Sequence, residues 1–142
     1  MTRLFFDSSA LFAGVHSIRG HAHDLLRLAS REVITLVVSQ YVLEETRRNL
    51  ATSVPESLVF LDLIVKNVPF ELIQPTKRDV LAATRYVALK DAPIVAAARK
   101  AKVDFLVTLD KKHLLGRPEL ARYIRAEIVT PKEAVIHLTR VS

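Results

Sequence analysis

Short apolar runs alternate along the chain with longer segments in which apolar residues recur every three or four positions. The runs predict β-strands and the spaced segments predict amphipathic helices. The predicted strands cover residues 3–6, 33–38, 70–73, 105–109 and 127–129. The predicted helices are one capped by Ser8 or Ser9 that runs to Val15, then 21–31, 40–51 with Ser39 as its cap, 55–66, 77–89 and 92–101, and a last one that opens at Pro131.

This alternation predicts the fold class. Strands separated by helices form βαβ units, which build a mainly parallel sheet, so the chain is expected to be an α/β protein. The segment "VITLVV" (33–38) is apolar at nearly every position, as expected for a strand that helices cover on both faces. A length of 142 residues suits one domain with a substantial core, so residues 1–142 are interpreted as a single domain.

Two of the predicted strands run directly into an acid. "RLFFD" ends in Asp7, and "FLVTLD" ends in Asp110. In open α/β sheets the ligand site lies beyond the carboxyl ends of the strands. The two acids are therefore predicted to lie at the edge of the sheet where a functional site forms.

Two further acids are candidates for the same site. Asp91 is expected at the N-cap or in the first turn of the helix that contains Pro93, and capping alone is the other interpretation of this residue. On the helix after Ser39, a rotation of about 100° per residue places Glu45 beside the inward face and Glu44 on the solvent side. The alternative interpretation is that both residues are ordinary surface glutamates with no role in a site.

Carboxylates that converge on one place repel each other and raise each other's pKa unless a cation neutralises them. The chain has no cysteine and no cluster of histidines that could form a zinc site. An all-oxygen ligand set favours Mg²⁺ or Mn²⁺ over zinc. Such an ion suits phosphodiester chemistry.

The composition indicates a polyanionic binding partner and excludes several classes of protein. The formal net charge is +6 and the pI is about 9.9, which is typical of nucleic-acid binders, although solubility alone would also account for it. Without cysteine, disulfides, thiolate metal sites and cysteine nucleophiles are excluded. The apolar runs are too short to span a bilayer, and Asp7 interrupts any signal-peptide pattern, so a cytoplasmic protein without a membrane partner is expected.

At this point the chain resembles the PIN-domain family of metal-dependent nucleases. The resemblance rests on "LFFDSSAL", "VVSQYVLEETRRNL" and "KDAPIVAAARKAKVDFLVTLD", which follow one another in the expected order over nearly the whole chain. It implies a three-layer α/β/α sandwich with a mainly parallel central sheet, an acidic site for Mg²⁺ or Mn²⁺, and endoribonuclease activity on RNA. Many small members are VapC-like toxins of prokaryotic toxin–antitoxin pairs, which a cognate antitoxin inhibits and which are often homodimers.

The resemblance assigns roles to individual residues. Carried over, the acidic quartet that binds metal is Asp7, Glu45, Asp91 and Asp110, with Asp7 and Asp110 as primary ligands. Ser9 and Thr108 match the polar residues that hydrogen-bond these acids. Members often carry another acid shortly after the last of these strands, where this chain has "KKHLL". If His113 takes that place, the site has one negative charge fewer and a second metal ion would be bound more weakly.

Several other polar residues carry weaker signals. Lys111, Lys112 and Arg48 are candidates for substrate-phosphate contacts, although a solvated helix face accounts equally well for Arg48. "HAHD" (21–24) resembles a metal motif, but residues two apart do not share a helix face, so a solvated helix start is favoured. Asp104 precedes its strand and is expected at the opposite edge of the sheet, away from the site.

Three functions remain open on the sequence alone. The favoured one is a metal-dependent endoribonuclease, and the apolar surface of its middle helices is compatible with a homodimer. The first alternative is a non-catalytic RNA-binding or protein-interaction module with the same fold. The second is a small-molecule phosphatase of the haloacid-dehalogenase kind, which would require an aspartate at position 9, where this chain has Ser9.

Overall fold

The first strand, "RLFF", lies at the centre of a five-stranded sheet, where the apolar side chains of its last three residues are buried. The computed structural model describes residues 1–140. The strands are β1 (Arg3–Phe6), β2 (Thr35–Ser39), β3 (Glu71–Ile73), β4 (Phe105–Val107) and β5 (Glu127–Val129), in the order β3-β2-β1-β4-β5. All neighbouring strands pair in parallel, so the mainly parallel sheet expected from the sequence is confirmed.

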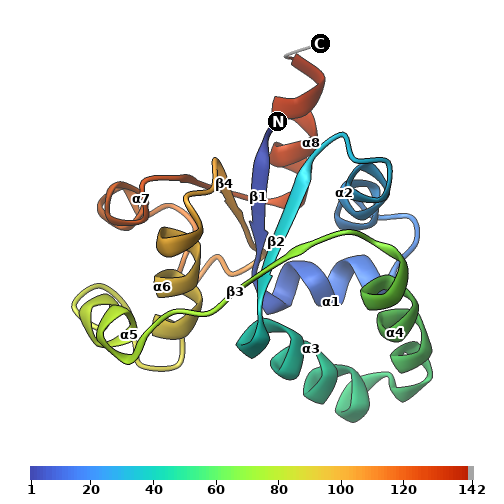
Figure 1. Cartoon of the computed structure of the whole chain (residues 1–142), viewed down its shortest axis with the longest axis horizontal. Coiled ribbons are helices and arrows are strands. Elements are labelled where there is room, and N and C mark those ends of the chain that lie inside the picture. Colours follow the sequence, from blue (N-terminus) through green and yellow to red (C-terminus); the bar gives the residue numbers. More distant parts are fainter. Residues whose placement is uncertain (141–142) are drawn as a thin grey trace.

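Helices cover both faces of the sheet, as Figure 1 shows. They are α1 (Ser8–His16), α2 (His21–Ser30), α3 (Gln40–Ser53), α4 (Leu58–Asn67), α5 (Lys77–Ala83), α6 (Ala92–Ala101), α7 (Pro118–Ile124) and α8 (Pro131–Arg140), with a short 3₁₀ turn at Pro55–Ser57. Helices α5, α6 and α7 stand on one side, while α1, α2 and α4 stand on the other and α8 packs against α2. The three-layer α/β/α sandwich is thereby confirmed.

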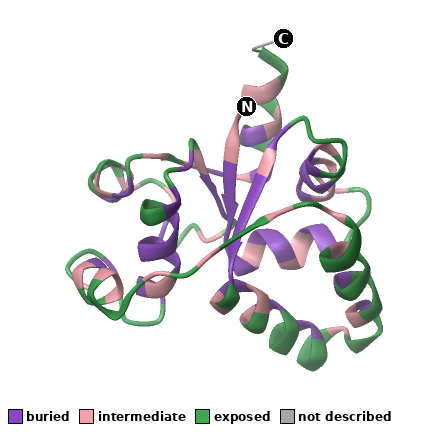
Figure 2. Cartoon of the chain, viewed as in Figure 1, coloured by how far each residue is buried: buried purple, intermediate pink, exposed green. Residues whose placement is uncertain are grey.

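The core lies around β1 and β4, in which every residue after the first is buried, and Figure 2 colours the central strands mostly as buried. Leu4, Phe5, Phe6, Leu106 and Val107 are completely buried. Full burial of an aliphatic or aromatic side chain stabilises a fold by roughly 1.5–3 kcal/mol, so these two short strands are rigid supports for whatever follows them. None of the helices described within residues 1–140 combines the length and the apolar character needed to cross a membrane.

Some expected element boundaries are wrong. Asp7, and neither Ser8 nor Ser9, is the N-cap of α1, because its carboxylate accepts a hydrogen bond from Ala10 N. The helix expected over residues 77–89 ends at Ala83 and continues as turns. Helix α7 was not expected at all. It has only seven residues, which is too short for a periodic signal, and the buried Leu120 and Ile124 attach it to the core.

The strand order creates a switch point beside β1. The chain leaves β1 toward β2 and β3 on one side, and it returns to β4 and β5 on the other. Ligand sites in open α/β sheets form where the strand order reverses in this way, outside the carboxyl ends of the strands. Phe6 pairs with Val107, so Asp7 and Thr108 follow directly at adjacent strand ends, and Asp7 N donates to Val107 O at 3.2 Å.

Candidate functional site

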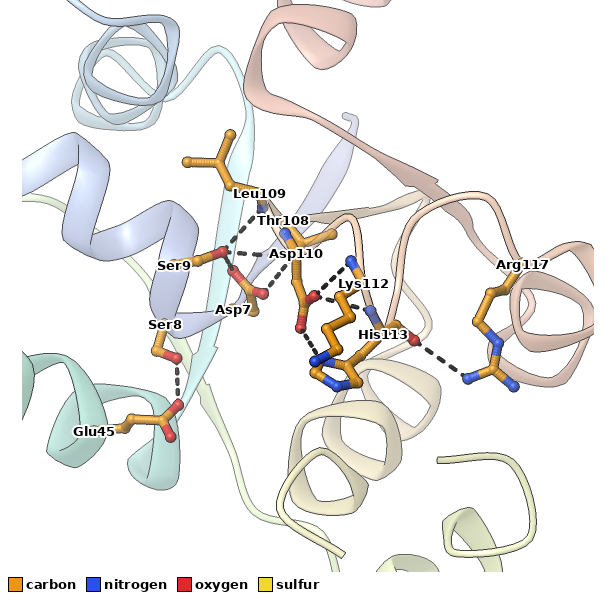
Figure 3. Close-up of polar contacts among 10 residues, drawn as sticks. All are labelled: Asp7, Ser8, Ser9, Glu45, Thr108, Leu109, Asp110, Lys112, His113 and Arg117. Atoms are coloured by element: carbon orange, nitrogen blue, oxygen red, sulfur yellow. Dashed lines mark hydrogen bonds and ion pairs between the residues drawn. The ribbon is translucent and has the colours of Figure 1, made fainter. Parts of the chain in front are cut away.

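A cavity of about 510 Å³ opens at this switch point. All four acids singled out in the sequence line it, namely Asp7, Glu45, Asp91 and Asp110, and Ser9 lines it with them. They come from the end of β1, from α3, from the residue before α6 and from the segment after β4. The fold therefore brings four carboxylates from distant parts of the chain to one cavity, part of which is shown in Figure 3.

Asp7 is the most buried of these acids, with 3% of its surface exposed. Its Oδ1 accepts hydrogen bonds from Ser9 Oγ at 2.7 Å and from Ala10 N at 2.9 Å, and its Oδ2 accepts one from the Thr108 hydroxyl. Burial raises the pKa of Asp7 to about 6, although the three hydrogen bonds oppose that rise. A carboxylate whose negative charge is this costly to bury favours a cation beside it.

The hydroxyls of Ser9 and Thr108 join the two strand ends. Thr108 is completely buried, and besides donating to Asp7 its Oγ1 accepts a hydrogen bond from Asp110 N at 3.0 Å. Ser9 Oγ accepts one from Leu109 N at 2.9 Å. These two side chains orient both oxygens of Asp7 and also the backbone that carries Asp110.

Asp110 is held by the turn that follows it. Its Oδ1 accepts backbone hydrogen bonds from Lys112 N at 3.0 Å and His113 N at 2.9 Å, and its Oδ2 lies 3.2 Å from His113 Nδ1. Figure 3 shows Asp110 between the Asp7 group and the His113 ring. The turn thus points one carboxylate oxygen and one imidazole toward the same space.

Within residues 1–140, one group of side chains has the spacing of metal ligands. Asp91, Asp110 and His113 each offer one ligand atom, and these atoms all lie within 4.8 Å of one another. From the sequence, His113 was interpreted as standing where relatives often have an acid. The structure places its imidazole where a ring nitrogen could bind a metal ion together with the two carboxylates.

Asp91 occupies the N-cap position of α6, but its side chain forms no capping hydrogen bond. Its backbone is already in the right-handed helical region, and only 8% of the residue is exposed. Burial raises the pKa of Asp91, with smaller contributions from Asp110 and Glu45 that Lys90 and His113 oppose. Capping alone therefore does not account for this acid.

Glu45 turns toward the cavity and Glu44 does not, as the helical period predicts. The Ser8 hydroxyl donates to Glu45 Oε1, whereas Glu44 is exposed and accepts a hydrogen bond from Gln40 Nε2 at 3.2 Å. Two polar residues that line the cavity, Asn49 and Lys90, were not named as site residues from the sequence. Asn49 lies one helical turn after Glu45, so the same period could have identified it.

The weaker candidates are placed as follows. Lys112 lines a neighbouring hollow together with Asp91 and His113, while Lys111 and Arg48 are exposed and line neither hollow. In "HAHD", the His23 ring contacts Gly14 O at 2.8 Å and helps to join α2 to α1. Asp104 lies at the amino end of β4, where it accepts a hydrogen bond from Arg3 N, on the side of the sheet away from the cavity.

The donor set fits a hard divalent cation. Among the ion pairs of residues 1–140, the contact between His113 and Asp110 is the one that involves the four acids, so their charges are largely uncompensated. The carboxylate oxygens match the ligand preferences of Mg²⁺ or Mn²⁺, and the imidazole beside them suits a transition ion such as Mn²⁺ better than Mg²⁺. The raised pKa of Asp7 also favours a bound cation, because a cation beside the carboxylate would offset the free-energy cost of burying its negative charge.

Comparisons with known proteins agree with this geometry. A family model described as PIN domain matches residues 3–112. No curated protein matches the chain.

Three solved structures illustrate the likeness of fold. PAE2754 from Pyrobaculum aerophilum is 17% identical with a TM-score of 0.68, over 98% of this chain and 96% of that one. VapBC2 from Rickettsia felis, bound to a DNA fragment from its promoter, is 13% identical with a TM-score of 0.64, over 91% and 98%. VapC20 from Mycobacterium tuberculosis, a toxin that cleaves the Sarcin-Ricin loop, is 18% identical with a TM-score of 0.52, over 77% and 91%.

Proposed function

The chain belongs to the PIN-domain family, and from this premise we propose that it is a divalent-metal-dependent endoribonuclease that hydrolyses RNA phosphodiester bonds. The observation that carries the proposal is the convergence of four carboxylates on one cavity at the switch point of the sheet. The net charge of +6 supports a polyanionic substrate. Cleavage of the Sarcin-Ricin loop by VapC20, a toxin of similar fold, supports the choice of RNA.

We propose Asp7 and Asp110 as the principal ligands of a Mg²⁺ or Mn²⁺ ion, with Glu45 and Asp91 binding it directly or through water. When bound, such an ion would polarise the phosphate and lower the pKa of a water molecule. The remaining work belongs to this chain's own side chains. Ser9 and Thr108 keep both oxygens of Asp7 in fixed directions, which preorganises the site before substrate arrives.

Basic residues beside the cavity would receive the substrate. Lys90 lines the same cavity as the acids, and Lys112 lines the adjoining hollow. Both are exposed, so their ammonium groups can reach a phosphate without leaving a buried charge behind. We propose these two lysines as phosphate contacts, in addition to the more remote Lys111 and Arg48.

Cleavage of a mixed single-stranded RNA pool tests the proposed function. The purified protein is expected to cut RNA with Mn²⁺ or Mg²⁺ and not with EDTA, and Asp110→Asn is expected to cut at least about 100-fold more slowly, because several kcal/mol of transition-state stabilisation depend on the ion. Glu44→Gln removes a nearby acid outside the cavity and should retain activity. No cutting in any metal, by folded protein free of inhibitor, would instead favour a non-catalytic RNA-binding module.

The imidazole of His113 leads to an expected metal preference. Mg²⁺ strongly prefers oxygen ligands, whereas first-row transition ions accept imidazole nitrogen. Wild-type protein is therefore expected to show a larger ratio of Mn²⁺ to Mg²⁺ affinity than His113→Asp, measured by calorimetry without RNA. His21→Asp, at the exposed start of α2, controls for loss of a histidine and gain of an acid. An unchanged ratio in His113→Asp would exclude the imidazole as a ligand.

We further propose that the protein is the toxin of a toxin–antitoxin pair and forms a homodimer. Two exposed apolar surfaces support protein partners. Helix α4 exposes about half of Val59, Phe60 and Leu63, and the α5 region exposes about 70% of Leu81 and Leu89. Co-purification with the product of the neighbouring reading frame would test the antitoxin, and light scattering of the chain alone would test the dimer.

A further inference from the structure

A basic hollow lies over α6, between α5 and α7, with a volume of about 860 Å³. These three helices stand together on one side of the sheet in Figure 1. Its lining contains five basic residues: Arg78, Arg99, Lys100, Lys102 and Arg125. The single acid in the lining, Asp79, is already engaged, because it accepts a hydrogen bond from Thr76 N at 2.9 Å in the capping box of α5. The hollow therefore has a strong excess of positive charge.

A second, smaller hollow of about 400 Å³ adjoins the acidic site and shares no lining residue with the larger hollow. It is lined by Arg85, Tyr86 and Lys112, and also by Asp91 and His113 of the site itself. Asp91 directly precedes α6, and the larger hollow surrounds the other end of that helix. Because α6 has ten residues, the two ends are roughly 15 Å apart. We call the two hollows together the α6 groove.

Two stacked tyrosines link the halves of the α6 groove. Tyr86 lines the smaller hollow and Tyr123 the larger one, and their rings stack with centroids 4.2 Å apart and planes at 23°. The Arg99 guanidinium lies over the Tyr123 ring, 4.8 Å from its centroid, and Arg99 Nε donates to Tyr123 O at 2.9 Å. An aromatic platform therefore sits midway along a basic path.

Helix stabilisation accounts for four of these five charges but not for Arg78, since Lys102 and Arg125 are the C-caps of α6 and α7. Arg99 and Lys100 lie in the last turn of α6, where cations favour the helix dipole. Arg78, however, lies in the first turn of α5, where a cation opposes the dipole. Neither Arg78 nor Lys102 takes part in the ion pairs found in residues 1–140. Arg78 thus adds positive charge to the hollow at a cost to its own helix, and five cations line the hollow against one acid, which points to an anionic ligand.

We propose that the α6 groove binds the single-stranded RNA that flanks the bond to be cut, a proposal that rests on the nuclease function above. The basic side chains contact successive phosphates, and Tyr86 stacks on a base. A length of roughly 15 Å accommodates about four phosphates at the axial spacing of roughly 3.4 Å in one strand of B-DNA. Basic grooves with aromatic platforms are characteristic of single-strand binding, since every base offers a face for stacking. That platform favours RNA over an acidic peptide.

Binding measured without cleavage tests the α6 groove. The probe is a fluorescent 15-nucleotide single-stranded RNA, titrated by anisotropy in EDTA at several salt concentrations. Arg78→Gln/Lys102→Gln is expected to bind more weakly and to reduce the slope of log affinity against log salt by about 0.7 for each phosphate that the variant no longer neutralises. The control, Lys66→Gln/Lys132→Gln, removes the same charge from α4 and α8. Equal affinities and slopes for the two double variants would overturn the proposal.

Three further readouts separate this proposal from the proposed function and from other ligands. Because the titration is done in EDTA, it is informative even if the protein cuts no RNA. If it does cut, the groove variant should have a higher KM for long RNA with an unchanged kcat. Tyr86→Leu should weaken RNA binding while leaving affinity for inorganic polyphosphate unchanged. Binding of poly-glutamate as tight as that of RNA would contradict a nucleic-acid groove.

Discussion

Asp7→Asn is expected to reduce RNA cleavage by at least roughly 10³-fold, because it removes a proposed principal ligand whose ion supplies several kcal/mol of transition-state stabilisation. The fold should survive. The asparagine Oδ1 can still accept the hydrogen bond from Ala10 N that caps α1, and the hydroxyls of Ser9 and Thr108 can rotate to suit an amide. Loss of activity would then reflect chemistry at the site.

The same substitution is expected to stabilise the metal-free protein at neutral pH. The pKa of Asp7 is about 6 in the folded protein against an ordinary value of 3.8, so between these values the folded state binds the proton more strongly than the unfolded state. Stability is therefore greatest below the lower value and falls as pH rises through about 6. The shift corresponds to roughly 3 kcal/mol, a cost that uncharged asparagine does not carry.

Urea unfolding of both proteins in EDTA, at pH 4 and pH 7.5, measures this effect. The Asp7→Asn variant should be more stable than wild type at pH 7.5, and its advantage should be much smaller at pH 4, where Asp7 is protonated in the native protein. Glu44→Gln, which neutralises an exposed acid, should show no such pH-dependent gain. An Asp7→Asn protein that keeps full activity would falsify the proposed site.

Thr108→Val should impair both stability and cleavage, although valine has nearly the same shape as threonine. The Thr108 hydroxyl is completely buried, donates to Asp7 and accepts from Asp110 N. Valine leaves a buried oxygen and a backbone N–H without this partner, at a cost of about 1–3 kcal/mol. Cleavage should fall about 100-fold, because the hydroxyl that orients both proposed ligands is absent from the variant.

Thr108→Ser is the matched control, since serine keeps the hydroxyl and removes only a methyl group. Its cleavage rate is expected to stay within about tenfold of wild type. Single-turnover rates with saturating RNA separate the two variants, and urea unfolding reports their stability. Equal rates for the valine and wild-type proteins would show that the hydroxyl does not position the acids.

Local pattern was sufficient to predict most of the sheet and the acids at its edge. An apolar strand covered by helices has a recognisable composition, so β1 and β4 could be found, and with them Asp7 and Asp110 at their carboxyl ends. The helical period also distinguished the cavity-facing Glu45 from the solvent-facing Glu44, because that period depends only on neighbours in the chain. Asp91 was identified as a candidate site residue, with helix capping as the alternative interpretation. The structure shows no capping hydrogen bond for its side chain.

Features that depend on distant segments were missed. Helix α7 is only two turns long, so packing of Leu120 and Ile124 decides its existence more than propensity does. The sequence indicated only that His113 stands where relatives often have an acid. Its position beside Asp91 and Asp110 follows from the turn after β4. The stack of Tyr86 on Tyr123 joins residues from two separate segments and has no local signature.

The sequence by itself determined which segments form the strands and which acids follow β1 and β4, because both follow from short-range polarity and spacing; the exact strand ends differ, since β4 stops at Val107, three residues before Asp110. Tertiary structure alone decided the strand order, which places β1 beside β4 and thereby brings Asp7 to Thr108 across 101 positions of sequence. It also decided the raised pKa of Asp7, since burial depends on every segment that packs around the carboxylate. A pKa and a ligand cluster are properties of an environment, and the environment exists only once the chain has folded.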